Sequence, residues 1–163
     1  MRKMAVLICL LVSCICMAEE KNWIEQKFGK ELIDAQGKVH KTSELKDKLV
    51  GIYFSAHWCP PCRAFTPKLV EFRDACAKEG FEIVFVSFDK SKADMDKYMS
   101  ETKMKWLAAP FGGQTANALR KEYDIHSIPT LLVLDKNGKV ISNKAHEEVM
   151  QDGKKALEKW RKK

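Results

Sequence analysis

LVGIYFSAHWCPPCRAFTPKLVEF, residues 49–72, joins the pattern of a buried strand to the pattern of a long helix through two closely spaced cysteines. Residues 49–56 are dense in β-branched and aromatic side chains, as in a strand that is buried on both faces. The helical pattern starts at Pro61, because proline suits the first turn of a helix, where no backbone N–H is needed. A strand that leads directly into a helix is typical of α/β proteins.

Cys59 and Cys62 have the spacing of a disulfide-exchange site. Cys59 precedes the helix, where unpaired backbone N–H groups and the positive end of the helix dipole favour an anion. Such a position lowers a cysteine pKa from ~8.5 to roughly 3.5–7.5, so that a thiolate exists at neutral pH. Cys62 lies one helical turn later, close enough to attack a mixed disulfide formed at Cys59.

Half of a zinc site is the alternative interpretation of this pair, and it requires a second Cys or His pair at ligand spacing. Outside the amino-terminal segment the only further cysteine is Cys76, and the histidines are scattered. The histidines are His40, His57, His126 and His146. We therefore expect redox chemistry at Cys59 and Cys62, with no metal and no other cofactor.

The first eighteen residues have the composition of an export signal. Arg2 and Lys3 precede an apolar run, residues 5–16, which is too short to span a bilayer comfortably. Small residues then suit cleavage before Glu19. An uncleaved membrane anchor is the alternative.

A lipoprotein signal is a second alternative, because residues 11–14 resemble a bacterial lipobox in which Cys14 would be lipidated. We therefore expect a signal peptide at residues 1–18, cleaved or ending before Cys14, and a single domain at residues 19–163. The protein would be exported: periplasmic, secreted or lipid-anchored. It would contact a membrane only if Cys14 were lipidated.

Charge gives little evidence of a nucleic-acid partner. The chain has 29 Lys and Arg against 22 Asp and Glu. The one basic cluster, in residues 154–163, lies on and beyond a final amphipathic helix, where cations complement the negative helix end. A nucleic-acid surface would need a basic face interleaved with aromatic residues. We expect no nucleic-acid partner.

Strand and helix signals alternate along the chain, as in α/β folds. Asn137-Gly138 is a strong hairpin turn between the last two strands. The expected strands are residues 31–34, 39–40, 49–56, 81–88, 130–134 and 140–143, and the further expected helices are residues 22–28, 92–103 and 115–123.

The long helix that follows the cysteine pair carries its apolar side chains on one face. These side chains are Phe65, Leu69, Phe72 and Cys76. Cys76 is therefore expected to be an inert small hydrophobe. Pro67 removes one helical hydrogen bond and should kink the helix rather than end it.

Four segments carry a family resemblance. Residues 54–72 (FSAHWCPPCRAFTPKLVEF) resemble the active-site segment of the tryparedoxins and nucleoredoxins within the thioredoxin superfamily. The similarity continues through FEIVFVSFD (81–89), WLAAPF (106–111) and SIPTLLVLD (127–135), and it covers roughly residues 25–150. The resemblance implies a thioredoxin-like α/β fold: a central mixed β-sheet flanked by helices, with the cysteine pair at the tip of the first long helix. It also implies thiol–disulfide exchange.

The sequence departs from these families in two respects. Tryparedoxins and nucleoredoxins are intracellular proteins, whereas this chain has the features of an export signal. Thioredoxin keeps a buried aspartate six residues before the first cysteine, and here that position is Tyr53. The proton acceptor for Cys62 is therefore unidentified.

The resemblance also implies site roles. Cys59 would be the attacking thiolate and Cys62 the resolving thiol, and the two would form a redox-active disulfide. Trp58 would be a flat apolar wall beside the sulfur, with plain core packing as its alternative. Arg63 would add positive potential near Cys59 or be an ordinary exposed arginine. His57 is not assigned as a base.

The Ile128–Pro129 bond is expected to be cis on the strength of the resemblance alone, since most X–Pro bonds are trans. A cis bond there would place the proline ring against the cysteine pair and leave the Ile128 backbone free. An extended substrate could then pair with Ile128 in the manner of a strand. Residues 106–111 would border the same surface or simply pack at the sheet edge.

Two function classes follow from these observations. The first is an enzyme, a monomeric thiol–disulfide oxidoreductase that reduces disulfides in exported proteins through Cys59 and Cys62. Its partners would be disulfide-containing proteins and an upstream electron donor. The second is a non-catalytic module that holds a client or a soft metal such as Cu(I) through the same thiols. A metal chaperone would usually bring extra Met or His near the pair.

Overall fold

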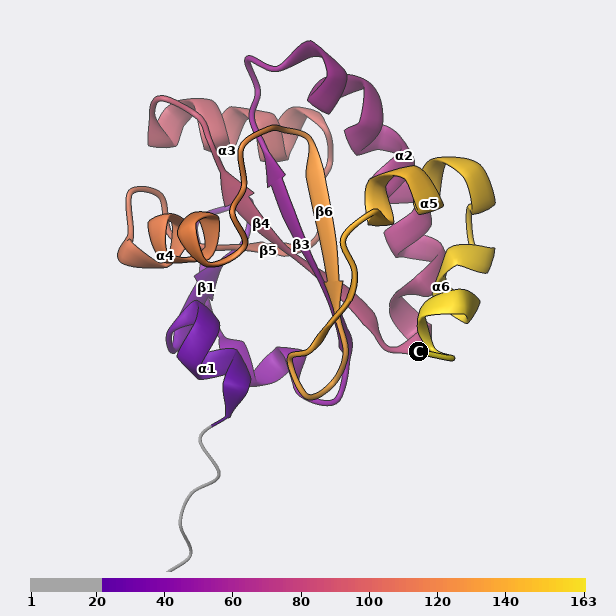
Figure 1. Ribbon diagram of the computed structural model, residues 1–163. Coiled ribbons are helices and arrows are strands. Elements are labelled where there is room, and N and C mark those ends of the chain that lie inside the picture. The colour runs from indigo at the N-terminus through magenta and orange to yellow at the C-terminus, as the bar shows by residue number, and fades with distance from the viewer. Residues whose placement is uncertain (1–21) are drawn as a thin grey trace, which may run out of the picture.

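Seven strands form one mixed sheet in the computed structural model, which describes residues 22–163 (Figure 1). Their order across the sheet is β2-β1-β5-β4-β3-β6-β7. The strands are β1 (Glu31–Ile33), β2 (Val39–Lys41), β3 (Leu49–Ser55), β4 (Phe81–Ser87), β5 (Leu107–Ala108), β6 (Thr130–Leu134) and β7 (Val140–Ser142). The β3–β4 and β4–β5 pairs are parallel and the other pairs are antiparallel. The expected mixed sheet flanked by helices is confirmed.

Helices cover both faces of this sheet (Figure 1). The helices are α1 (Trp23–Phe28), α2 (Pro60–Cys76), α3 (Lys92–Glu101), α4 (Gln114–Glu122), α5 (Ala145–Asp152) and α6 (Lys155–Trp160), with short 3-10 helices η1 (Thr42–Leu45) and η2 (Ala77–Glu79). Side chains of α2, α3, α5 and α6 pack on one face, and those of α1, η1 and α4 pack on the other.

The central strands explain why each face has its own core. Successive side chains of a strand point to opposite faces. Tyr53 of β3 therefore joins the core beneath α2, whereas its neighbours Ile52 and Phe54 join the core beneath α1 and α4. The expectation that residues 49–56 and 81–88 form strands buried on both faces is confirmed.

Helix α2 begins one residue before the predicted start. Cys59 is its N-cap, and Pro60 and Pro61 occupy the first positions, where no backbone N–H is needed. The helix continues through Pro67 to Cys76, so the prediction that this proline does not end the helix is confirmed. Cys76 is fully buried in the core, as its helical spacing predicted, and burial raises the pKa of its thiol.

Strand β5 was not predicted from the sequence. Residues 106–111 contain strand β5, which pairs with both β1 and β4. At two residues, β5 is too short for alternating hydrophobicity to reveal it. The expected signal at residues 1–18, with Cys14, lies outside the described residues. Within residues 22–163, no helix is long and apolar enough to cross a membrane.

Candidate active site

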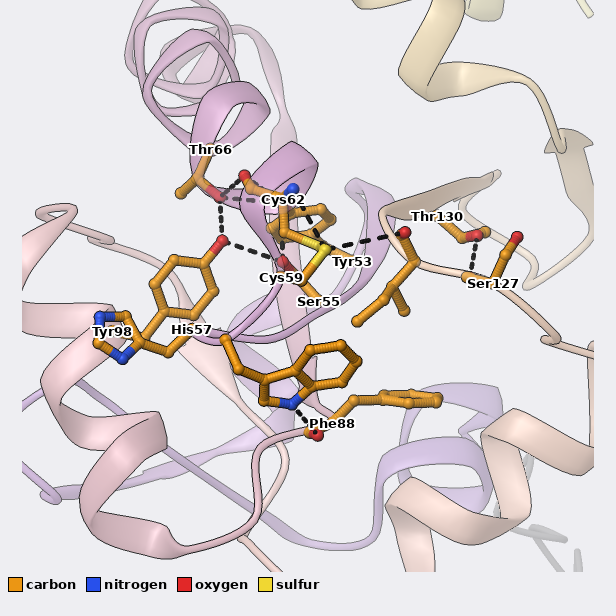
Figure 2. Close-up of a disulfide and its surroundings, with 12 residues drawn as sticks. Tyr53, Ser55, His57, Cys59, Cys62, Thr66, Phe88, Tyr98, Ser127 and Thr130 are labelled. Carbon is orange, nitrogen blue, oxygen red and sulfur yellow. Dashed lines mark hydrogen bonds between the residues drawn. A yellow bond between two sulfur atoms is a disulfide. The ribbon is translucent and has the colours of Figure 1, made fainter.

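Cys59 and Cys62 form a disulfide at the N-terminus of α2 (Figure 2). Cys59 is 3% exposed and Cys62 is fully buried. The Cys62 backbone N–H donates to the Cys59 sulfur at 3.3 Å. The Cys59 sulfur thus occupies the position at the helix end where backbone donors favour a negative charge.

Pro129 brings a second segment to the cysteine pair. The Ile128–Pro129 bond is cis, as the resemblance implied. The Ile128 carbonyl oxygen lies 3.8 Å from the Cys59 sulfur. This is a contact and not a hydrogen bond, because a disulfide sulfur carries no proton. At the first residue of β6, the Thr130 hydroxyl donates to the Ser127 carbonyl at 2.7 Å and fixes this turn.

Trp58 lies at the surface beside the pair. Its side chain is 55% exposed, which excludes plain core packing, and its indole N–H donates to the Phe88 carbonyl at 3.0 Å. Phe88 in turn contacts the cluster formed by Ala56 and the two cysteines. The indole nitrogen is thus anchored, and a flat apolar ring stays exposed beside the cysteine pair. Arg63 is exposed on α2.

Residues 106–111 are divided between the core and a surface cavity. Trp106 is 1% exposed and packs in the core, whereas Phe111 is partly buried. Phe111 borders a cavity of about 240 Å³ together with Phe88 and Arg120. The Arg120 guanidinium lies 4.9 Å from the centre of the Phe88 ring.

Asp89 is a site residue that sequence reasoning missed. It follows β4, whose carboxyl end lies beside that of the parallel strand β3. Its carboxylate accepts the backbone N–H of His57 at 2.8 Å and the Ser87 hydroxyl at 2.8 Å. Burial raises the pKa of Asp89, and these hydrogen bonds only partly offset the effect. Asp89 therefore fixes the segment that precedes Cys59.

The His57 ring is engaged with α3. Its Nε2 atom lies 3.0 Å from a carboxylate oxygen of Glu101, and its ring centre lies 5.7 Å from that of Tyr98. Within residues 22–163, no group of three or more His, Cys, Asp or Glu side chains is arranged to hold a metal ion.

Tyr53, at the position of the aspartate found in thioredoxin, is part of a buried hydroxyl cluster. Its partners are Ser55, Thr66 and Tyr98, which Figure 2 shows gathered beside Cys62. Burial raises the pKa of Tyr53, so its hydroxyl stays neutral. Sequence alternation could have placed Tyr53 and Ser55 on one face, but it could not have brought Thr66 and Tyr98 to them.

Comparison with known proteins gives consistent matches. A family model described as Thioredoxin-like matches residues 47–140. Nucleoredoxin from Bos taurus is 44% identical over 124 residues, which are 74% of this chain and 28% of that protein. Tryparedoxin from Trypanosoma brucei brucei is 40% identical over 124 residues, which are 74% of this chain and 84% of that protein. The chain thus spans less than a third of the nucleoredoxin.

Solved structures agree with these sequence matches. Tryparedoxin II from C. fasciculata has a TM-score of 0.74 at 35% identity, covering 80% of this chain and 92% of that chain. Tryparedoxin II complexed with glutathionylspermidine has a TM-score of 0.70 at 36% identity, covering 76% of this chain and 86% of that chain.

The expectation of export is wrong. The chain matches nucleoredoxins and tryparedoxins, families of intracellular proteins, and no match points to export. The expectation rested on the composition of residues 1–18 alone. An apolar run behind two cations is a weak signal, and these residues lie outside both the matched range and the described part of the chain.

Fold, cysteine position and matches agree with one another. The mixed sheet places a Cys-x-x-Cys disulfide at the N-terminus of its longest helix and a cis-proline beside it. The range matched by the family model, residues 47–140, includes both cysteines and Pro129. The chain belongs to the thioredoxin-like family of oxidoreductases, as a tryparedoxin- and nucleoredoxin-like member with the Cys59–Cys62 pair at its active site.

Proposed function

We propose that this protein reduces disulfide bonds in protein substrates through the Cys59–Cys62 dithiol. The observation that carries the proposal is the position of the Cys59 sulfur. It lies at the N-terminus of α2, accepts the Cys62 N–H and lies beside Ile128 and the cis-Pro129. Such a position favours a thiolate over a thiol, and the half-buried residues Ile128 and Pro129 lie beside it.

The reaction proceeds in two exchanges. The Cys59 thiolate attacks one sulfur of the substrate disulfide, so a mixed disulfide forms and the other substrate sulfur leaves as a thiolate. Cys62 loses its proton and attacks the Cys59 sulfur, which forms the Cys59–Cys62 disulfide and releases the second substrate thiolate. Two electrons pass from the protein to the substrate, and both leaving thiolates take up protons from water.

The substrate surface surrounds the cysteine pair. Trp58 provides an exposed apolar wall, and the Ile128 backbone pairs with an extended substrate segment. A donor must then reduce the Cys59–Cys62 disulfide again. We assign this role to a low-molecular-weight thiol, on the support of the glutathionylspermidine found with tryparedoxin II. The protein acts as a monomer in this scheme.

Redox equilibration and turnover test the proposal. The protein is equilibrated against glutathione buffers, and the reduction of insulin by dithiothreitol is followed with the protein as catalyst. We expect a defined potential between about −270 and −120 mV and catalysis that Cys59→Ser abolishes. Cys76→Ser is the matched control and should retain both properties. Stoichiometric Cu(I) binding without insulin reduction would instead establish the non-catalytic module.

A further inference from the structure

Four buried hydroxyl oxygens form a closed ring of contacts at hydrogen-bond distance beside Cys62 (Figure 2). Tyr53 and Ser55 come from β3, Thr66 from α2 and Tyr98 from α3, and all four are fully buried. The Ser55 oxygen lies 2.9 Å from the Tyr53 hydroxyl and 3.0 Å from the Tyr98 hydroxyl. The Thr66 oxygen lies 2.9 Å from the Tyr53 hydroxyl and 2.5 Å from the Tyr98 hydroxyl, which closes the ring.

Thr66 connects the ring to the backbone of Cys62. The Thr66 hydroxyl donates to the Cys62 carbonyl oxygen at 2.8 Å, and the Tyr53 hydroxyl lies 3.5 Å from the same oxygen. Because a carbonyl oxygen only accepts, the single Thr66 proton is committed to Cys62. Both tyrosine hydroxyls then donate to the Thr66 oxygen, and Ser55 donates to Tyr53, so three protons serve the four contacts of the ring. The bonds therefore run in one direction, toward the Cys62 carbonyl, and each bond polarises the next.

One backbone hydrogen bond is missing from the first turns of α2, because Pro67 has no N–H to donate to the Arg63 carbonyl. Around the cysteine sulfurs the packing is apolar: Ala56, Phe88 and Ile128. Among the described residues, no carboxylate is fully buried. The hydroxyl ring is thus the polar structure that holds this part of the helix.

We propose that this ring is a positioning device for the second exchange only. It holds Cys62 where its sulfur can attack the Cys59 sulfur of a mixed disulfide, and it takes no part in the first attack by Cys59. The inference rests on the proposed function. Its physical basis is that intramolecular attack depends steeply on geometry, whereas the first attack depends on the Cys59 thiolate and the helix N-terminus.

Dithiobis(nitrobenzoate) separates the two exchanges in one stopped-flow trace. The Cys59 thiolate attacks the reagent and releases one coloured thionitrobenzoate, and Cys62 then displaces the second while the Cys59–Cys62 disulfide forms. Thr66→Val keeps the branched shape but removes both the donor to Cys62 and the acceptor of the two tyrosines. We expect its second release to slow by about tenfold or more while the first release stays within about twofold of the parent.

Three further variants complete the test. Thr66→Ser should restore the second release, because it restores the hydroxyl. Thr42→Val is the matched control, since Thr42 is equally buried and its hydroxyl donates to the Gly29 carbonyl at 2.9 Å, away from the cysteines. Tyr98→Phe should also slow the second release, and it decides the question should Thr66→Val fail to fold.

The outcomes distinguish this inference from the proposed function. An unchanged rate of the second release in Thr66→Val overturns the positioning role, and if that variant does not fold, the same result in Tyr98→Phe does so. An equal slowing of both releases also overturns it. A parent protein in which Cys59 reacts no faster than an ordinary thiol contradicts the proposed function itself. A slowed second release that Thr66→Ser restores supports the ring as the device that positions Cys62.

Discussion

At the scale of single residues, the two active-site cysteines have different surroundings. The Cys59 sulfur accepts the Cys62 N–H and lies near the Ile128 carbonyl. Cys62 is fully buried behind it, and its carbonyl is bonded to Thr66. Of the two sulfurs, that of Cys59 therefore has the backbone donor, and Cys59 has the greater exposure, which the proposed function uses to assign it the first attack.

This asymmetry predicts which variant traps a substrate. Cys62→Ser keeps its nucleophile and loses its resolving thiol, so it should accumulate mixed disulfides with substrate proteins. Cys59→Ser should capture nothing. Non-reducing electrophoresis, followed by mass spectrometry of the trapped species, measures the outcome. Trapping by Cys59→Ser alone would show that the two roles are reversed.

Asp89 provides a second prediction at this scale, on pH dependence. Burial raises its pKa above the ordinary 3.8, so the folded protein holds this proton more tightly than the unfolded chain does. The protonated Asp89 carboxyl therefore contributes its full share of the unfolding free energy below pH 3.8, the ordinary pKa. This contribution is lost as the pH rises through the raised pKa of the folded protein. Asp89→Asn cannot ionise and still accepts the His57 N–H.

We expect Asp89→Asn to match the parent melting temperature at about pH 4 and to exceed it at about pH 7. Scanning calorimetry across this range gives the difference. Asp96→Asn, at a partly exposed position of α3, is the control and should show no such rise. A lower melting temperature for Asp89→Asn at neutral pH would mean that its hydrogen bonds outweigh the cost of burying the charge.

At the scale of elements, Glu148 joins the last strand to the last two helices. Its carboxylate accepts the Ser142 hydroxyl of β7 at 2.5 Å and the Trp160 indole N–H of α6 at 2.6 Å. Burial opposes ionisation, but these bonds and Lys163 outweigh it and lower the pKa of Glu148. Helix α6 has six residues and depends on such contacts, because isolated helices of that length are unstable.

Removing the Glu148 carboxylate should therefore loosen α6. Glu148→Ala leaves the buried Trp160 N–H without its acceptor, and we expect a loss of roughly 1–3 kcal/mol in unfolding free energy. Urea titration measures this loss. Glu147→Ala, at an exposed position of α5 next to Glu148, is the control and should change the unfolding free energy little. Equal stability of the two variants would contradict the bridging role of Glu148.

At the scale of the whole molecule, the two cores share one sheet. Leu119 of α4 lies in the core on one face, and Trp160 of α6 lies in the core on the other face. Strands β3 and β4 contribute side chains to both cores. Loss of packing on one face should therefore lower the stability of the other as well.

Leu119→Ala tests this coupling. Truncation of a buried leucine costs roughly 2–5 kcal/mol. We expect one unfolding transition at a lower denaturant concentration, with far-ultraviolet circular dichroism and tryptophan fluorescence coinciding. Trp106 and Trp160 report on the opposite face and Trp23 on the face of Leu119, so a fluorescence trace with two separate transitions would show that the faces unfold separately.

Local sequence was enough to predict the long helix, the two central strands and the last hairpin. Alternation and β-branched residues marked β3 and β4, proline and helical spacing marked α2, and Asn137-Gly138 marked the last hairpin. These signals are local because burial of one face repeats with the period of the element. The proximity of Cys59 and Cys62 at the start of a helix also followed from their spacing alone, and the cis bond at Pro129 followed from the family resemblance.

Tertiary structure decided what surrounds the cysteines. The approach of Ile128 to Cys59, the bond from His57 to Asp89 and the meeting of Tyr98 with Thr66 each join segments more than thirty residues apart. Such contacts depend on strand register and on which helix covers which face, and no local period encodes either. Sequence therefore determined the reactive pair, and the fold decided which residues position it.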